Sequence, residues 1–384
     1  MNPAHSAATR RVLYLSGTRA DFGLMRGTLQ RAAANPALAL NVAVTGTHLD
    51  AAHGNTVDDI RAAGLPVVTE LPVDVLTRTP ASMSVAVAKC LQGMAALLEQ
   101  QRPDILLLLG DRGEMLAGAI AALNQGVVTV HIHGGERSGT VDELMRHAIS
   151  KLCSYHLVAT EESRDRLIRM GEASERIHVV GAPGLDGLTD LASGAREEVL
   201  AALDLPSDQP FILVAFHPVV QQAGLAYEQT RALMQALQQQ VCPLLWLEPN
   251  ADAGALGVLQ ALDEGPLPAG SRRVTHLSRV LFAQAMRHAA VMVGNSSSGI
   301  IEAASFGTPV INIGDRQRLR QRNANTVDVP AETEALSSAL RQALACERLP
   351  LHNRYGDGQA GARIVELLIR LPLTPSVLEK TNAY

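Results

Sequence analysis

The sequence predicts an α/β protein of two domains, each built on a parallel sheet, and three observations support this. The chain has 384 residues, more than the roughly 150 of a typical single domain. Short apolar runs alternate with alanine-rich stretches of helical spacing, the pattern of repeated strand-helix-strand units. Runs such as residues 105–109 are apolar throughout, as strands buried on both faces of a parallel sheet are.

The first half of the chain holds seven expected strands, each short and rich in leucine or β-branched residues. They lie at residues 12–16, 40–45, 67–71, 105–109, 127–131, 156–159 and 177–180. Apolar spacing between them predicts helices over residues 24–34, 82–101, 115–124 and 163–170. Because such crossovers are right-handed, these strands are expected to form one parallel sheet.

A polar region at residues 192–209 predicts a linker, after which a second series begins. Its strands are expected at residues 211–215, 244–247, 291–294 and 310–313, and its helices at 225–240, 280–288, 299–306 and 336–345. The predicted domains are therefore residues 1–190 and 191–367.

Composition excludes several classes of protein. The net charge is −5 and only Lys89, Lys151 and Lys380 are lysines, so a nucleic-acid partner is not expected. The four cysteines show no CxxC spacing, which indicates buried thiols rather than a zinc site or a disulfide framework. The first eleven residues are polar and no stretch reaches the ~18 apolar residues of a membrane span. We therefore expect a cytoplasmic enzyme with no membrane partner.

In open parallel sheets, ligands bind beyond the carboxyl ends of the strands, so the residues that follow each strand are the informative ones. After the first strand, a glycine-flanked turn with Arg19 leads into a helix, whose N-terminus can hold phosphate. The alternative is a tight turn with a surface arginine. After the second strand come His48 and His53, which are candidate metal ligands or polar loop lining.

Asp111 and Arg112 follow the buried run at residues 105–109 directly. A carboxyl group there is shielded on one side, so burial and a neighbouring arginine can shift its pKa, as acid–base catalysis requires. The alternative is that Asp111 caps the next helix.

The following strand ends in His131, His133 and Glu136, with Asp142 and Arg146 shortly after. Two histidines that are two positions apart on a strand have side chains on the same face of the sheet. Together with a nearby glutamate they resemble a zinc or iron site. No third ligand is evident, and carboxylates with histidines around a Gly-Gly turn also suit proton transfer, which is the interpretation we favour.

The second domain offers a nucleotide site. His217 follows its first strand, as a candidate catalytic group or a buried histidine. Ser296 and Ser297 lie where a later strand joins a helix, a place suited to a diphosphate, and Glu302 could accept ribose hydroxyls. Arg316 follows the next strand and brings a positive charge to the same edge.

Together the motifs GTRADFG, TGTHLD, LGDRGEM, VGAPGLD, HIHGGERSGTVDELMRHAISKL and GNSSSGIIEAASFGTPVINIGDRQ resemble the UDP-N-acetylglucosamine 2-epimerase family, in particular its hydrolysing branch of sialic-acid-type biosynthesis. The resemblance implies the glycosyltransferase-B fold, in which two Rossmann-like domains face each other across a cleft and residues 368–384 return toward the first domain. It implies anti elimination of UDP to a 2-acetamidoglycal and hydration to N-acetylmannosamine, without NAD, metal or another cofactor. A UDP-sugar is the expected partner, and we expect a homodimer.

By position, the resemblance assigns chemistry to Asp111, Asp142 and His217. It assigns nucleotide contacts to Arg19, Arg146, Ser296, Ser297, Glu302 and Arg316. We also predict His48 and Arg112 as substrate- or UDP-binding residues. Where several relatives have HxEGGE this chain has HIHGGE, so His133 replaces a catalytic glutamate, and either His133 or Glu136 takes its role.

Three alternatives stay open. The same chemistry could act on a UDP-2,4-diacetamido-2,4,6-trideoxy sugar of the legionaminic pathway. The fold also serves UDP-sugar glycosyltransferases, which would need an acceptor, and a non-catalytic sensor would bind UDP-sugar without releasing UDP. Glycal formation without an acceptor separates the first from the other two.

Overall fold

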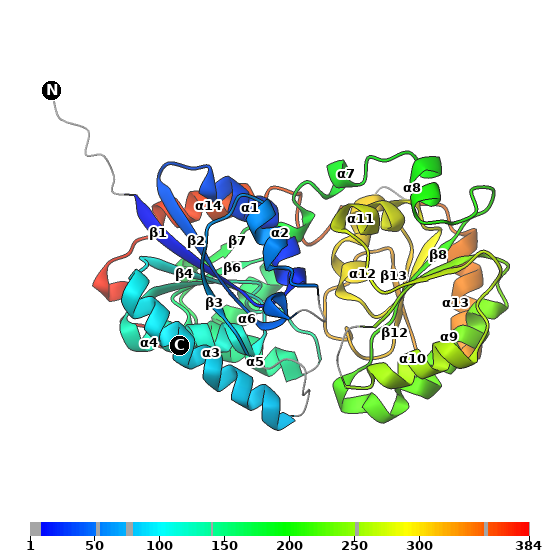
Figure 1. Ribbon diagram of the computed structural model, residues 1–384, viewed down its shortest axis with the longest axis horizontal. Coiled ribbons are helices and arrows are strands. Elements are labelled where there is room, and N and C mark those ends of the chain that lie inside the picture. Colours follow the sequence, from blue (N-terminus) through cyan, green and yellow to red (C-terminus); the bar gives the residue numbers. More distant parts are fainter. Residues whose placement is uncertain are drawn as a thin grey trace. The chain divides into compact units, whose positions relative to one another are not determined.

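A computed structural model describes residues 9–50, 54–73, 80–139, 141–249, 253–348 and 352–383. The chain divides into two compact units. The first unit comprises residues 1–136, 141–186 and 355–384, and the second comprises residues 137–140 and 187–354. Each contains a parallel sheet with helices on both faces (Figure 1), which confirms the predicted fold class of two Rossmann-like α/β domains.

In the described residues, the sheet of the first unit has seven strands in the order β3-β2-β1-β4-β5-β6-β7, and their pairing is parallel. The strands are β1 (Arg10–Ser16), β2 (Leu38–Thr45), β3 (Val67–Leu71), β4 (Ile105–Leu109), β5 (Val128–Ile132), β6 (Tyr155–Val158) and β7 (Ile177–Val179). The helices are α1 (Arg19–Ala33), α2 (Val57–Ala62), α3 (Pro80–Gln101), α4 (Gly113–Gln125), α5 (Val141–Leu152), α6 (Glu161–Arg169) and α14 (Ala360–Arg370).

The two faces of this sheet bury different helices because side chains alternate along each strand. On β1, Val12 and Tyr14 pack in a core with α1, α2 and α14, whereas Leu13 and Leu15 pack with α3, α4 and α5. Helix α14, close to the C-terminus, lies beside α1 (Figure 1). Sequence-distant segments therefore complete the first unit.

The sheet of the second unit has six strands among the described residues, in the order β10-β9-β8-β11-β12-β13, again parallel. They are β8 (Ile212–Ala215), β9 (Leu244–Leu247), β10 (Arg272–Val274), β11 (Val291–Gly294), β12 (Val310–Ile313) and β13 (Thr326–Val329). One face packs with α9 (Ala226–Gln238), α10 (Ala255–Glu264) and α13 (Thr333–Ala345), and the other with α8 (Arg196–Ala202) and α11 (Arg279–His288). Two short helices complete it, α7 (Leu188–Leu191) and α12 (Ser297–Ile301).

Some elements differ from the sequence-based expectation. The strands β10 and β13 were missed because they are edge strands, only partly buried and with polar residues in their sequences. The helix expected at residues 299–306 is instead α12 followed by a 3₁₀ turn at Ala303–Phe306. The polar stretch expected as a linker contains α8.

Two expectations drawn from composition differ from the structure. The segment Ala81–Gln101 of α3, with a mean hydropathy of 1.4, is long and apolar enough to cross a membrane. One such helix is weak evidence, since core helices of globular domains pass the same test, although only 22% of this window is buried. Of the four cysteines, which are all free thiols, Cys346 is exposed rather than buried.

Candidate functional site

The strongest cluster in the first unit centres on the buried guanidinium of Arg146, on α5. Its Nη2 donates to the carboxylate of Asp111, which follows β4. Its Nη1 donates to the backbone carbonyl of Glu136, at 3.0 Å. Arg146 is 1% exposed, whereas the Asp111 side chain is 26% exposed. One arginine therefore fixes the loops after β4 and β5, and leaves the carboxylate of Asp111 accessible to solvent.

The capping interpretation of Asp111 does not describe this helix. Helix α4 begins at Gly113, and its N-cap residue is Arg112, which makes no side-chain capping bond. A carboxylate that is held by a buried arginine and still reaches solvent can accept a hydrogen bond or a proton from a ligand.

Glu136 and His133 form a second pair, three residues apart. His133 Nδ1 donates to the Glu136 carboxylate, and both residues are at least nine-tenths buried. His133 has a φ of +64°, and Gly135 has a φ of +72°. A Cβ atom on Gly135 would lie 2.4 Å from the carbonyl oxygen of Ser163, so only glycine fits there. The Gly-Gly turn thus folds the chain back and brings the imidazole to the carboxylate.

The expected alternation of His131 and His133 is wrong, because β5 ends at Ile132 and His133 adopts a left-handed backbone. His131 is fully buried, where its Nε2 donates to the Gly110 carbonyl at 2.7 Å and its Nδ1 pairs with Ser150 Oγ at 3.1 Å. Burial lowers the pKa of His131 to about 3, so the ring is neutral. Among the described residues, no group of three or more metal-ligating side chains gathers.

Asp142 lies in the first turn of α5 and is exposed. It precedes Arg146 by four residues, so the two side chains leave the helix on the same face. The structure therefore places the two predicted aspartates on elements that Arg146 joins.

The turn after β1 differs from an open phosphate loop. The amides of Gly17 and Thr18 donate to the carboxylate of Asp21, at 2.9 and 2.8 Å, within a capping box at the start of α1. Arg19 is half-exposed, and its Nε lies 3.5 Å from a carboxylate oxygen of Asp59. The Asp21 carboxylate therefore accepts hydrogen bonds from the same backbone amides that were predicted to bind phosphate.

His48 lies behind this turn rather than at the surface. It is fully buried, its Nε2 pairs with Ser16 Oγ at 2.9 Å, and its Nδ1 pairs with Thr56 Oγ1 at 2.7 Å. Burial lowers the pKa of His48, against the opposing charge of Asp21. His53, its companion in the sequence, lies outside the described residues.

The loops of the second unit are joined by Asn295, which follows β11 and is 1% exposed. Its Oδ1 accepts the His217 amide and its Nδ2 donates to the His217 carbonyl, both at 2.8 Å. Arg316 Nη1 and Gln317 Nε2 donate to the Asn295 carbonyl at 3.0 and 3.1 Å. Burial, together with the charge of Arg316, lowers the pKa of His217 to about 3. Asn295 therefore gathers three predicted segments at one sheet edge.

Ser296 is the N-cap of α12, where its Oγ accepts the Ser298 amide at 3.4 Å, and Ser297 is the first residue of that helix. Glu302 is 4% exposed and forms an ion pair with Arg279 of α11, at 2.5 Å. The carboxylate that was expected to meet ribose hydroxyls thus has a cationic partner in this structure.

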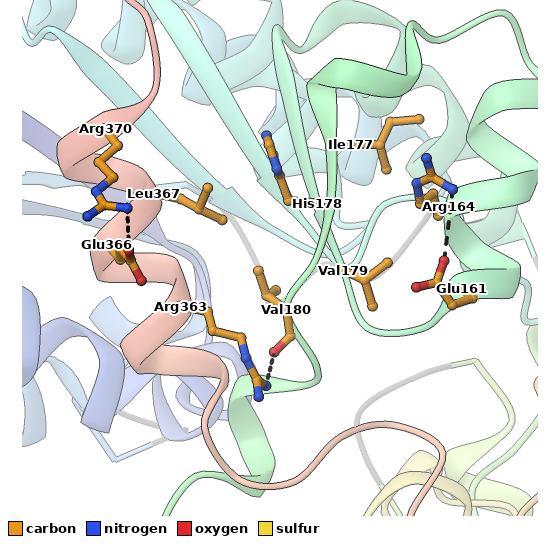
Figure 2. A pocket seen from close by; sticks show the side chains of 10 residues that line it. All are labelled: Glu161, Arg164, Ile177, His178, Val179, Val180, Arg363, Glu366, Leu367 and Arg370. Carbon is orange, nitrogen blue, oxygen red and sulfur yellow. Dashed lines mark hydrogen bonds and ion pairs between the residues drawn. The ribbon is translucent and has the colours of Figure 1, made fainter.

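A cavity of about 540 Å³ lies elsewhere on the first unit, along the edge strand β7 (Figure 2). Its arginines are already committed, since Arg363 pairs with Asp357 and Arg370 with Glu366. None of the residues predicted from the sequence lines it. We therefore place the candidate site at the carboxyl ends of the strands and not in this cavity.

Sequence reasoning missed Asn295, Arg279 and Glu114 as participants. Asn295 and Glu114 lie inside the quoted motifs, and Arg279 lies in none of them. The partners of Asn295 and Arg279 are 21 or more positions away, and the glycines around Glu114 are 68 and 97 positions away, so a single sequence gives no signal for these contacts.

The fold and the site define an α/β enzyme with acid–base groups after the strands of one sheet and a serine-lined helix start after a strand of another. A family model described as UDP-N-acetylglucosamine 2-epimerase matches residues 30–369. A Legionella pneumophila protein named UDP-N,N'-diacetylbacillosamine 2-epimerase (hydrolyzing) is 44% identical over 375 residues, which are 98% of this chain and 100% of that protein. The chain belongs to the UDP-N-acetylglucosamine 2-epimerase family, as the motifs predicted.

Two further comparisons agree. A UDP-N-acetylglucosamine 2-epimerase of Neisseria meningitidis is 32% identical over 352 residues, 91% of each protein. Among solved structures, the UDP-GlcNAc 2-epimerase from Neisseria meningitidis bound to UDP-GlcNAc has a TM-score of 0.80 at 18% identity, over 94% of this chain and 100% of that one. At that identity the likeness shows the fold, which is of the glycosyltransferase-B type.

Proposed function

We propose that this enzyme is a hydrolysing UDP-sugar 2-epimerase, which releases UDP and the free sugar inverted at C2. The observation that carries the proposal is the 44% identity, over 98% of the chain, to a relative named for that reaction. The cluster of Asp111, Glu136 and His133 around Arg146 supports it, because the reaction needs an acid and a base and this cluster supplies candidates for both.

The proposed substrate is UDP-N,N'-diacetylbacillosamine, the 2,4-diacetamido-2,4,6-trideoxy sugar that the sequence left as the second choice after UDP-N-acetylglucosamine. Identity to the relative named for the diacetamido sugar is 44%, against 32% to one named for UDP-N-acetylglucosamine. This difference favours the diacetamido sugar, although both relatives share the family.

The proposed chemistry has two steps. A base removes the proton at C2 while the bond from C1 to the phosphate oxygen breaks, so UDP leaves with the electron pair and a 2-acetamidoglycal forms. Water then adds its oxygen to C1, and an acid delivers a proton to the opposite face of C2. The C2–H is a weak acid, so stabilising the departing diphosphate matters most, and arginines with a helix start supply that stabilisation.

In this scheme Asp111, Asp142 and the Glu136–His133 pair divide the proton transfers. A histidine bonded to a glutamate can hold and pass a proton, so this pair can take the role of the glutamate that His133 replaces.

Ser296, Ser297 and Arg316 form the proposed UDP site of the second unit, where Asn295 holds the loops. His217, whose backbone Asn295 also holds, stays a candidate catalytic residue.

The test is an assay of UDP release from both UDP-sugars, with the sugar product identified by NMR. We expect kcat/KM to be at least ~10-fold higher for the diacetamido sugar, the scale of one well-placed hydrogen bond. Release of UDP from UDP-N-acetylglucosamine alone would identify that sugar as the substrate. If neither UDP-sugar releases UDP in the absence of an acceptor, a glycosyltransferase or a sensor is favoured. The homodimer and the cytoplasmic location stay predictions, and light scattering in solution tests the first.

A further inference from the structure

The loop after β4 carries a second carboxylate, Glu114, to which neither the sequence motifs nor the proposed mechanism assigns a role. Its side chain is 15% exposed. In the described part of the chain its only ion pair is with Arg112, whose Nε lies 3.6 Å from Oε2. The neighbouring Asp111 is held by a buried arginine at much closer range. Glu114 is therefore a largely buried carboxylate whose one ion pair is long, which leaves its oxygens able to accept hydrogen bonds from a ligand.

The carboxylate lies where the loops after β1, β2 and β4 meet. An added Cβ atom on Gly46, whose φ is +61°, would lie 3.2 Å from Glu114 Oε1 and 2.4 Å from the Gly17 carbonyl oxygen. An added Cβ atom on Gly17 would lie 3.5 Å from Glu114 Cδ. The Thr47 amide donates to the Gly17 carbonyl at 3.0 Å and fixes the two loops together. Glycine backbone thus packs around the carboxylate at the carboxyl edge of the sheet.

The local charge indicates what can bind there. Asp21 lies beside Gly17 and takes its amide, so two carboxylates flank this turn. The Gly17 amide is therefore not available to a phosphate group, whereas a hydroxyl or an amide N–H can donate to Glu114. Parallel sheets bind ligands at this edge, and the diphosphate has its proposed place in the second unit.

We propose that Glu114 is a substrate-binding residue that accepts a hydrogen bond from a hydroxyl or acetamido N–H of the sugar, and not from the nucleotide. The inference rests on the proposed function, since a UDP-sugar must be the ligand. Beside the acid–base residues, Glu114 would then determine specificity, because its carboxylate binds more tightly those sugars that have a hydrogen-bond donor at this position.

The experiment compares Glu114→Ala and Glu114→Gln with wild type, and uses Glu99→Ala, an exposed glutamate of α3, as the matched control. We expect Glu114→Ala to lower kcat/KM for the preferred UDP-sugar about ten- to a hundredfold, the range for a bond to a charged group. The calorimetric Kd for UDP should stay within about twofold, and Glu99→Ala should change neither quantity. Glu114→Gln keeps the shape and supplies the measurement if the alanine variant fails to fold.

Two results would overturn the proposal: kcat/KM within about twofold of wild type in both Glu114 variants, or an equal loss of affinity for UDP itself. If wild type releases no UDP from any UDP-sugar, the proposed reaction fails, but the binding comparison still decides about Glu114. In that case the gain in affinity of UDP-sugar over UDP must shrink in Glu114→Ala, and by less in Glu114→Gln, whose neutral amide oxygen still accepts a weaker bond; an unchanged gain in both variants rejects the contact.

Discussion

Replacing Arg146 by methionine should both destabilise the first unit and disable the site, because one buried guanidinium holds two loops. Removing one partner of a buried ion pair costs about 3–5 kcal/mol. The Asp111 side chain is 26% exposed, so water can solvate the orphaned carboxylate in part. We therefore expect the lower end, about 3 kcal/mol, to which the lost bond to the Glu136 carbonyl contributes.

That loss corresponds to a decrease in Tm of about 6 to 12 °C for a unit of this size. Thermal and urea unfolding followed by circular dichroism measure it. Arg370→Met is the matched control, because Arg370 is 75% exposed and its ion pair with Glu366 should contribute under about 1 kcal/mol. In the same preparations kcat should fall at least ~10²-fold, since Asp111 loses its orientation.

The double variant Arg146→Met/Asp111→Asn separates the ion pair from simple packing. Neutralising Asp111 removes the uncompensated charge, so the double variant should recover about 1 to 3 kcal/mol relative to Arg146→Met alone. Stability of Arg146→Met within about 0.5 kcal/mol of wild type would refute the reasoning, and so would a double variant that recovers nothing.

Four further outcomes are expected. Asp111→Asn and Asp142→Asn should each lower kcat at least ~10²-fold with the calorimetric Kd for UDP unchanged, and near-normal turnover in both variants would contradict their catalytic roles. Product formed by wild type in deuterated water should carry deuterium at C2, and an unlabelled C2 would contradict elimination. Ser297→Ala and Arg316→Ala should weaken UDP about ten- to a hundredfold, and an unchanged Kd would move the UDP site elsewhere. The pKa of His131 is lowered by burial from 6.5 to about 3, so the unfolded chain takes up a proton there first as the pH falls, and this residue alone should lower stability below about pH 6.5 by up to about 1.4 kcal/mol per pH unit; urea unfolding between pH 7 and 5 should therefore show a shallower decline in His131→Asn. Dialysis against a chelator should leave turnover intact, because arginines can carry the diphosphate charge, and activity lost and then restored by zinc or manganese would contradict this.

Much of the fold could be predicted because most residues of its buried strands are apolar. The strands at Ile105–Leu109, Leu244–Leu247, Val291–Gly294 and Val310–Ile313 have the bounds that were predicted from the sequence. The edge strands β10 and β13 were invisible to the same reasoning, since a strand with solvent beside it tolerates arginine and aspartate. A run of apolar residues indicates a buried strand, so this signal is missing where a strand is only partly buried.

Part of the candidate site could be predicted too. The rule that ligands bind at the carboxyl ends of strands selected Asp111, Glu136 and His217. The same rule also selected His48, which the structure buries behind Ser16 and Thr56. A position after a strand indicates which edge a residue lies at, but not whether its side chain points outward.

The sequence by itself determined the alternation of strands and helices, the family through its motifs, and the residue types available at each sheet edge. Only the tertiary structure decided which of these residues meet. Arg146 joins Asp111 to the Glu136 loop across 35 and 10 positions, and Asn295 reaches His217 across 78. Such hydrogen bonds form where the parallel strands bring loops that are distant in the sequence close together. Local propensity and residue spacing do not indicate which loops meet. The position of the Glu114 carboxylate beside Gly46 became visible for the same reason.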